Sequence, residues 1–144
     1  MTSFTPSRLA GLLALALFAL PAMAQSPVGQ WRTIDDETGE PKSIVRIFEE
    51  NGRMVGEIVK LLPEGRRCQD CAGSYNNSTL RGTRILSGLT RDGDEYNGGR
   101  IIDPKTGKTY KVKMKVQRDG RLYLRGYIGV PALGRTQYWE RVSR

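Results

Sequence analysis

Two cysteines are the residues of this sequence most able to do chemistry, because the 144 residues contain no histidine. The absence of histidine excludes Ser–His and Cys–His nucleophile pairs, histidine general bases and histidine-containing metal sites. Cys68 and Cys71, in the motif CQDC, supply only two of the four ligands that a structural zinc site needs. We therefore expect no enzymatic activity, cofactor or metal site, with carboxylate or lysine chemistry as the remaining enzymatic alternatives.

The motif CQDC has two interpretations, a structural disulfide and a thioredoxin-like redox pair. A redox pair has its first cysteine at the start of a helix, whereas the flanking segments PEGRR and AGSYNNS show no helical periodicity. We predict a Cys68–Cys71 disulfide, which in so short a loop contributes about 2 kcal/mol. Arg66 and Arg67 would favour the thiolate of a free cysteine, which keeps the redox alternative open.

Carboxylates gather in segments that have the composition of turns. Asp103 lies directly before Pro104, where a carboxylate commonly caps its own turn. The alternative is a calcium or magnesium site, in which Asp92, Asp94 and Glu95 could join Asp103. The acidic segment 35–40 lacks the ligand spacing of a calcium loop. Nothing in the sequence brings two chosen acids together across a cleft, as glycoside hydrolysis requires. We therefore predict turns at these positions.

The first 24 residues have the pattern of a secretory signal peptide. A short polar start with Arg8 leads into LAGLLALALFAL, and Pro21 precedes AMA, whose small residues have the spacing of a cleavage site. A membrane anchor is the weaker alternative, because the apolar run is short and no cysteine follows to take a lipid. We predict a signal peptide at 1–24, a single domain at 25–144 without a transmembrane segment, and a periplasmic or secreted location.

The chain is strongly basic, with a net charge of +8 that falls to +7 without the predicted signal peptide, where Arg8 is the only charged residue. A cationic exported domain is attracted to anionic surfaces such as lipid headgroups and wall polymers. Its basic residues are scattered along the sequence, which favours a simple role in solubility. Export and a disulfide argue against a nucleic-acid partner.

Turn-forming residues recur at short intervals and separate segments of alternating polarity, which is typical of an antiparallel sandwich or barrel. Few residues show helical periodicity, so closure into a barrel is the economical way to leave no open sheet edge. We predict an all-β fold, a small antiparallel barrel of about eight strands. The expected strands are 29–35, 43–49, 53–62, 82–89, 96–103, 109–117, 121–128 and 135–142.

The hairpin 109–128 shows the alternation most clearly. Its first strand places three lysines on one face, opposite an apolar face that contains Val112 and Met114. Its second strand places Leu122, Leu124 and Ile128 on one side. We expect the apolar sides to form the core and the basic sides to face solvent.

Polar residues near the C-terminus are the candidates for a ligand site. Arg125, Arg135 and Gln137 flank a turn rich in glycine and proline, and Tyr110 and Tyr127 belong to neighbouring predicted strands. If they point inward, they could hold the acidic head of an amphipathic ligand. The favoured alternative is structural, with the arginines pairing across strands, covering apolar surface or closing the barrel.

In their order and spacing, several motifs resemble the bacterial exported family known as domain of unknown function 2147. They are GQW, TIDDETGEPKSIVRIFE, GEIVKLL, CQDC, GGRIIDPKTGKTYK and LRGYIGVPALGRTQYWER, and they cover almost all of the predicted domain. The resemblance implies a small barrel akin to lipocalins and no established activity.

The resemblance also implies how the barrel closes. In lipocalin-like proteins a Gly-x-Trp motif opens the first strand, and its indole packs against an arginine of the last strand. Gly29 and Trp31 match the motif, and Arg141, or alternatively Arg135, is the expected partner. Such a cation–π contact contributes about 0.5–2 kcal/mol.

Together these features predict a non-enzymatic exported barrel that binds a small apolar or amphipathic molecule in a central cavity. The alternative is a cationic interaction module of the cell envelope that holds an anionic surface or a protein partner. The first hypothesis requires a cavity larger than a few waters, and the second requires a contiguous basic patch.

Overall fold

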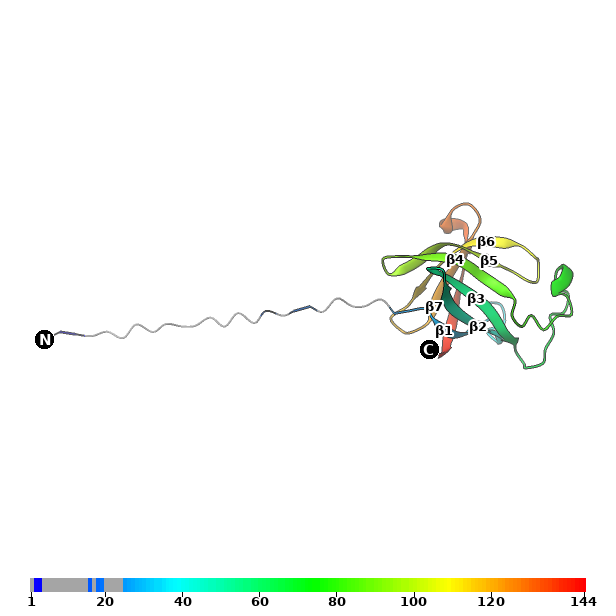
Figure 1. The fold of residues 1–144 in the computed structure, drawn as a ribbon, viewed down its shortest axis with the longest axis horizontal. Coiled ribbons are helices and arrows are strands. Elements are labelled where there is room, and N and C mark those ends of the chain that lie inside the picture. Colours follow the sequence, from blue (N-terminus) through cyan, green and yellow to red (C-terminus); the bar gives the residue numbers. More distant parts are fainter. Residues whose placement is uncertain (1, 4–15, 17, 20–24) are drawn as a thin grey trace.

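Eight antiparallel strands follow one another around a closed barrel, and β8 pairs with β1 to complete it (Figure 1). The computed structural model describes residues 2–3, 16, 18–19 and 25–144, so nearly all of the predicted signal peptide lies outside the described residues. The fold confirms the predicted eight-stranded all-β barrel. Its strands are β1 (Gly29–Ile34), β2 (Pro41–Glu50), β3 (Arg53–Leu61), β4 (Arg84–Asp92), β5 (Glu95–Ile102), β6 (Thr109–Val116), β7 (Leu122–Tyr127) and β8 (Arg135–Ser143).

The connections alternate between the two ends of the barrel and differ in length. Short turns join β2 to β3, β4 to β5 and β6 to β7 at one end, which we call the narrow end. Asn51 and Gly52 form the first of these, with the positive φ angles of 52° and 75° that an Asn-Gly hairpin turn requires. The longer connections lie at the other end, the mouth, and include the short helices η1 (Gly73–Tyr75) and η2 (Pro131–Leu133).

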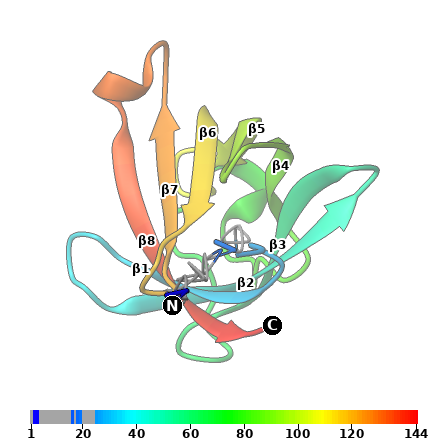
Figure 2. The ribbon, with the colours of Figure 1, turned by 90° about the vertical axis from the view of Figure 1, so that its left-hand side faces the viewer.

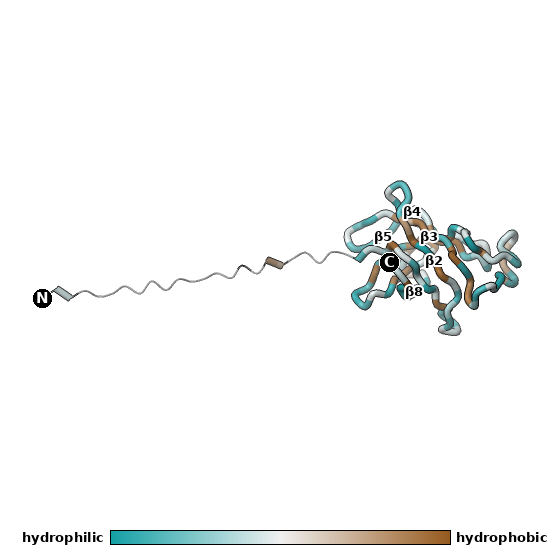
Figure 3. Tube along the Cα trace, turned by 60° about the horizontal axis from the view of Figure 1, so that its bottom comes forward, coloured by the Kyte–Doolittle hydropathy of each residue, from teal (hydrophilic) through white to brown (hydrophobic). Residues whose placement is uncertain are grey.

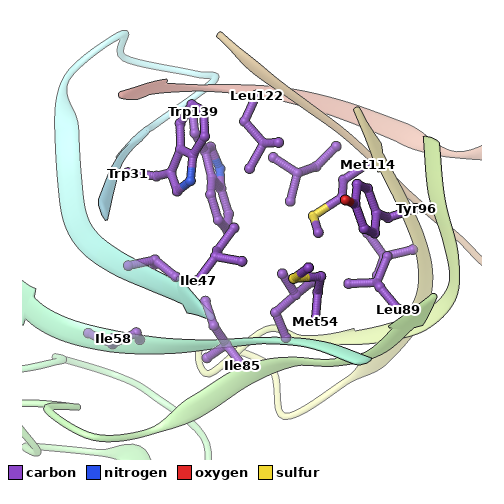
Figure 4. Packing of buried hydrophobic residues seen from close by; sticks show 14 of the residues in the cluster. Trp31, Ile47, Met54, Ile58, Ile85, Leu89, Tyr96, Met114, Leu122 and Trp139 are labelled. Carbon is purple, nitrogen blue, oxygen red and sulfur yellow. The ribbon is translucent and has the colours of Figure 1, made fainter. Parts of the chain in front are cut away.

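Apolar and polar residues alternate along the strands (Figure 3), and the apolar side chains of this pattern are buried inside the barrel. The interior near the narrow end is filled by a contiguous cluster in which Met54 and Met114 approach from opposite walls (Figure 4). Val112, Met114, Leu122 and Leu124 are buried, as the alternation of the hairpin predicts. The prediction for Ile128 is wrong: its side chain is 67% exposed, because β7 ends at Tyr127.

Two strand glycines allow the walls to come close together. A side chain at Gly99 would collide with Leu89, and a Cβ at Gly56 would lie 2.9 Å from the Cβ of Leu86. Both glycines face inward, where the opposing side chains fill the space that a Cβ would need. The strands β3, β4 and β5 are therefore closely packed at these two positions.

The narrow end is closed by Trp31 and Arg141. The indole is fully buried, and its Nε1 donates a hydrogen bond of 2.7 Å to the Pro27 carbonyl. The Arg141 guanidinium lies 4.1 Å from the indole centroid and donates to the carbonyls of Ser26 and Val28. Burial lowers the pKa of Arg141 from its ordinary value. Arg135 takes no part in this contact.

Gly29 allows the segment before β1 to cross the narrow end of the barrel. Its φ of 136° is a conformation that other residues rarely adopt, and a Cβ at this position would collide with the Ser143 carbonyl. The glycine thus lets the segment before β1 approach the end of β8. Arg141 then reaches that segment and joins the two ends of the domain.

Candidate ligand-binding site

The half of the barrel near the mouth is hollow. A pocket of about 700 Å³ opens between the four longer connections, within the size range of small-molecule sites. Trp139, only 2% exposed, lines this pocket and also belongs to the buried apolar cluster. The deepest walls are apolar side chains from several strands, namely Ile58, Ile85, Val112, Leu124 and Trp139.

We call these apolar walls the floor of the pocket, and polar groups form a belt between the floor and the mouth. Thr33 and Ser43 face each other from β1 and β2, with 2.7 Å between their hydroxyl oxygens. Gln137 accepts a hydrogen bond of 3.0 Å from Nε1 of Trp139 through its amide oxygen, which leaves its amide N–H groups free to donate. Tyr110 belongs to the same lining. The belt therefore offers donors and acceptors to a ligand that reaches the floor.

Charged residues surround the mouth, and several neutralise one another. Arg135 forms a two-pronged ion pair with Asp36, which lowers the pKa of that carboxyl, and Lys42 lies 3.1 Å from Asp35. Lys105 also lines the mouth and makes no ion pair with any residue that the structure describes.

Arg66 is the second unmatched cation at the mouth. Its guanidinium makes one long hydrogen bond, 3.5 Å, to the Leu62 carbonyl and pairs with no acid among residues 25–144. Arg66 and Lys105 are therefore the cations best placed to meet an anionic group at the mouth.

The structure brings four of the five ligand candidates together at the pocket, namely Tyr110, Tyr127, Arg135 and Gln137. Arg125 does not line the pocket. It alternates with Leu124 and Gly126, which line the pocket, so its own side chain lies on the outer face.

Arg125 instead organises the β7–β8 connection. Its guanidinium donates to the carbonyls of Pro131 and Ala132 and to the Thr136 hydroxyl, at 2.9, 3.2 and 2.8 Å. The favoured structural interpretation thus describes Arg125 well. Arg135 ties the start of β8 to the β1–β2 connection through Asp36, while it also lines the mouth.

The sequence analysis missed residues of two kinds. Thr33 and Ser43 lie on the same inward faces as Trp31 and Val45, so the period of two could have identified them. Arg66 and Leu80 reach the pocket from the long β3–β4 connection, which has no periodicity to indicate their direction. Only the tertiary fold brings these two side chains to the mouth.

A Cys68–Cys71 disulfide, as predicted, holds the β3–β4 connection, and both cysteines line the pocket. Backbone hydrogen bonds of 2.7 Å join Cys68 to Ser78 and Asn77 on the returning part of the connection. Ala72 donates to the Pro104 carbonyl, which attaches this connection to the one between β5 and β6. The disulfide therefore helps to shape one wall of the mouth.

Asp103 has the predicted role in its turn. Its carboxylate accepts hydrogen bonds from the Lys105 amide and the Thr106 hydroxyl, at 2.9 and 3.3 Å. Among the residues that the structure describes, no three acidic or cysteine side chains group as a metal site would require. None of the helices in the described part of the chain has the length and apolar character needed to cross a membrane.

Asp35, at the mouth, makes the stability of the folded protein depend on pH. The amides of Thr38 and Glu37 and the Lys42 ammonium hold its pKa at about 2, below its ordinary value of 3.8. Because the folded-state pKa is lowered, we expect its contribution to stability to be complete above pH 3.8 and lost as the pH falls towards 2. An NMR titration of the carboxyl carbon should show a midpoint near 2.

Two variants check the cause of this shift. Lys42→Met keeps both amide bonds, so the pKa should stay below 3.8. Asp35→Asn should flatten the dependence of the free energy of unfolding on pH between 2 and 3.8. A wild-type midpoint at the ordinary value would contradict the assignment.

Comparison with known proteins is consistent with this architecture. The family model described as "Uncharacterized protein conserved in bacteria (DUF2147)" matches residues 29–141. The chain is also similar to the structure of protein HP1028 from the human pathogen Helicobacter pylori, which is described as belonging to the lipocalin family. The two are 25% identical, with a TM-score of 0.68, over 81% of this chain and 82% of that chain. No curated protein sequence matches the chain.

Proposed function

The chain belongs to the family of uncharacterized bacterial proteins DUF2147, and on this basis and that of its lipocalin-like barrel we propose that it is an exported, non-enzymatic protein that binds a small amphipathic molecule. The ligand occupies the pocket of about 700 Å³ at the mouth. Its apolar part contacts the floor, and its polar head lies among the side chains of the belt and the mouth.

The change in polarity with depth is the observation that carries this proposal. The inward face of β8 presents Trp139 at the floor, Gln137 in the belt and Arg135 at the mouth. An apolar chain on the floor would remove apolar surface from water, at about 25 cal/mol per Å². A polar head at the mouth would keep its contact with water and with the free amide of Gln137.

The cations that remain unpaired at the mouth favour an anionic head there, and Glu40 and Asp103 are the carboxylates of the same lining without an ion pair in residues 25–144. Lys42 and Arg135 are already matched by Asp35 and Asp36, whereas Arg66 and Lys105 have no acidic partner in residues 25–144. A carboxylate or phosphate between Arg66 and Lys105 would gain charge-assisted hydrogen bonds. The expected ligand class is therefore a single-chain amphiphile with an acidic head.

The first experiment is native mass spectrometry of the protein purified after export, followed by solvent extraction of what it carries. An additional mass close to one per chain, of lipid size, would support the proposal and identify the ligand class. The same measurement tests for cleavage after residue 24 and for two hydrogens missing at the disulfide.

A direct titration uses 11-(dansylamino)undecanoic acid, an acidic amphiphile, with its methyl ester as the uncharged control. We expect saturable binding of the acid, energy transfer to the dansyl group from Trp139 at the pocket floor, and about tenfold weaker binding of the ester. Arg66→Gln together with Lys105→Gln should remove this preference for the acid. A bare protein mass combined with no saturable binding of either probe would overturn the proposal.

A further inference from the structure

The β7–β8 connection carries three large apolar side chains that face solvent. Ile128, Val130 and Leu133 are 67%, 55% and 82% exposed, and we call them the apolar tip. The connection stands clear of the others at the mouth (Figure 2). Grouped apolar side chains of this kind on a soluble protein mark surfaces of interaction.

The tip is held in this exposed conformation. The Arg125 guanidinium binds the carbonyls of Pro131 and Ala132, and the Leu133 amide donates to the Val130 carbonyl at 3.1 Å. Gly134 lies where any side chain would collide with the Gly126 carbonyl. These contacts order the backbone before any partner binds, so little conformational entropy would be lost on docking.

Beside the tip, basic side chains gather on the outer surface of β5 and β6 and on the connection between them. Lys111 lies opposite both Tyr127 and Arg100 in the strand register, and Lys113 lies opposite Arg125. Together with two lysines of the β5–β6 connection these residues form what we call the basic flank, namely Arg100, Lys105, Lys108, Lys111 and Lys113.

The basic flank is free of acidic partners. None of its five members makes an ion pair with a residue that the structure describes. Lys115, further from the mouth on the same strand, pairs with Asp94 and marks where the uncompensated surface ends. The nearby carboxylate of Asp103 is engaged by its own turn.

We propose that the apolar tip and the basic flank together dock this protein on an anionic lipid bilayer. The tip enters the boundary between headgroups and acyl chains, while the flank meets lipid phosphates, the combination by which peripheral proteins bind membranes. A bilayer fits better than a protein partner because the tip is a projecting aliphatic surface, without the aromatic anchors and complementary pocket of a typical protein interface.

The surroundings of the tip define an orientation for docking. On the other side of β8, the β1–β2 connection carries Glu37 and Glu40, which make no ion pair among residues 25–144 and which anionic lipid would repel. The barrel therefore tilts towards β5 and β6. Because Ile128 and Leu133 also line the pocket, docking places the mouth against the lipid. This proposal does not depend on the pocket being a ligand site.

The test is co-sedimentation of the exported protein with vesicles of phosphatidylcholine alone or mixed with phosphatidylglycerol. We expect binding to the mixed vesicles, weakened by added salt, and little binding to phosphatidylcholine alone. Val130→Asp and the double variant Lys111→Glu, Lys113→Glu should each weaken binding at least about tenfold.

Matched controls lie at the narrow end. Val142→Asp changes a valine that is 45% exposed on β8, and Arg53→Glu with Arg118→Glu changes the net charge by the same amount as the lysine variant. Both controls should stay within about twofold of the wild type.

Three results would overturn the proposal: no binding to mixed vesicles at low salt, equal weakening by tip and control variants, or binding that Val130→Asp leaves unchanged. Equal weakening would indicate unspecific attraction of a basic protein. Binding of a protein at the tip without binding of vesicles would assign the surface to a protein partner. Val130 does not line the pocket, so the dansyl titration of Val130→Asp reports separately on the ligand site.

Discussion

Replacing Trp31 with alanine is expected to lower the free energy of unfolding by about 3–5 kcal/mol, the largest effect on stability expected here. The substitution opens a cavity beside β1 and β8 at the narrow end, because the indole is fully buried in the apolar cluster. It also removes the hydrogen bond to the Pro27 carbonyl and the surface on which Arg141 lies. Urea denaturation followed by circular dichroism measures the change.

The control is Val142→Ala at the same end of the barrel, where truncating an exposed side chain should change stability by no more than about 0.5 kcal/mol. Arg141→Lys keeps the charge but loses the planar stack on the indole and the paired hydrogen bonds to two carbonyls, so it should also lower the free energy of unfolding. A double-mutant cycle of Trp31→Ala and Arg141→Lys should show a coupling of about 0.5–2 kcal/mol. Additive effects of the two substitutions would show that the stack does not close the barrel.

Replacing Gly126 with phenylalanine is expected to weaken binding of the dansyl acid more than tenfold while the barrel stays folded. A Cβ at Gly126 would have ordinary contacts, 3.8 Å to Cγ2 of Ile101 and 3.9 Å to Cβ of Tyr110, so the larger side chain extends into the pocket. The backbone is extended there and tolerates a β-forming residue. Alanine, leucine and phenylalanine at this position should reduce affinity in that order.

The matched control places the same side chain outside the pocket. Thr109→Phe changes an exposed residue of β6 that does not line the site, so affinity for the dansyl acid should remain unchanged. Melting temperatures of both variants should stay close to that of the wild type. Undiminished binding by a folded Gly126→Phe protein would place the ligand somewhere other than this pocket.

The barrel was predictable because its strands obey a local rule. Each strand alternates inward and outward residues, and turn formers such as Asn51-Gly52 separate consecutive strands, so strand number and pairing follow from neighbouring residues. The rule fails where a strand ends. Ile128 continues the inward pattern of Leu122 and Leu124 in the sequence, but the strand ends at Tyr127 and the chain turns at Gly129, whose φ is 79°.

The pocket was predictable only in part. Gln137 belongs to a strand, and alternation with Trp139 places it inside, whereas Arg125 on the adjacent strand is one position out of phase and faces outward. Arg66 comes from an irregular connection, where direction depends on tertiary contacts. The distribution of basic residues also appeared even along the sequence. The uncompensated flank emerges only because the register places Arg100 of β5 directly opposite Lys111 of β6, beside Lys113 on the same face of that strand.

The joining of the first strand to the last has a consequence for incomplete chains. Arg141 and Val28, joined by a hydrogen bond, are 113 positions apart, so the final contacts of the barrel are also among its most distant in sequence. A chain that stops before β8 leaves β1 and β7 as open edges, with unpaired backbone groups that can template pairing with other chains. Truncation after β7 should therefore produce aggregates instead of a smaller barrel. The nine residues of β8 cover the two edges that the other seven strands would leave open.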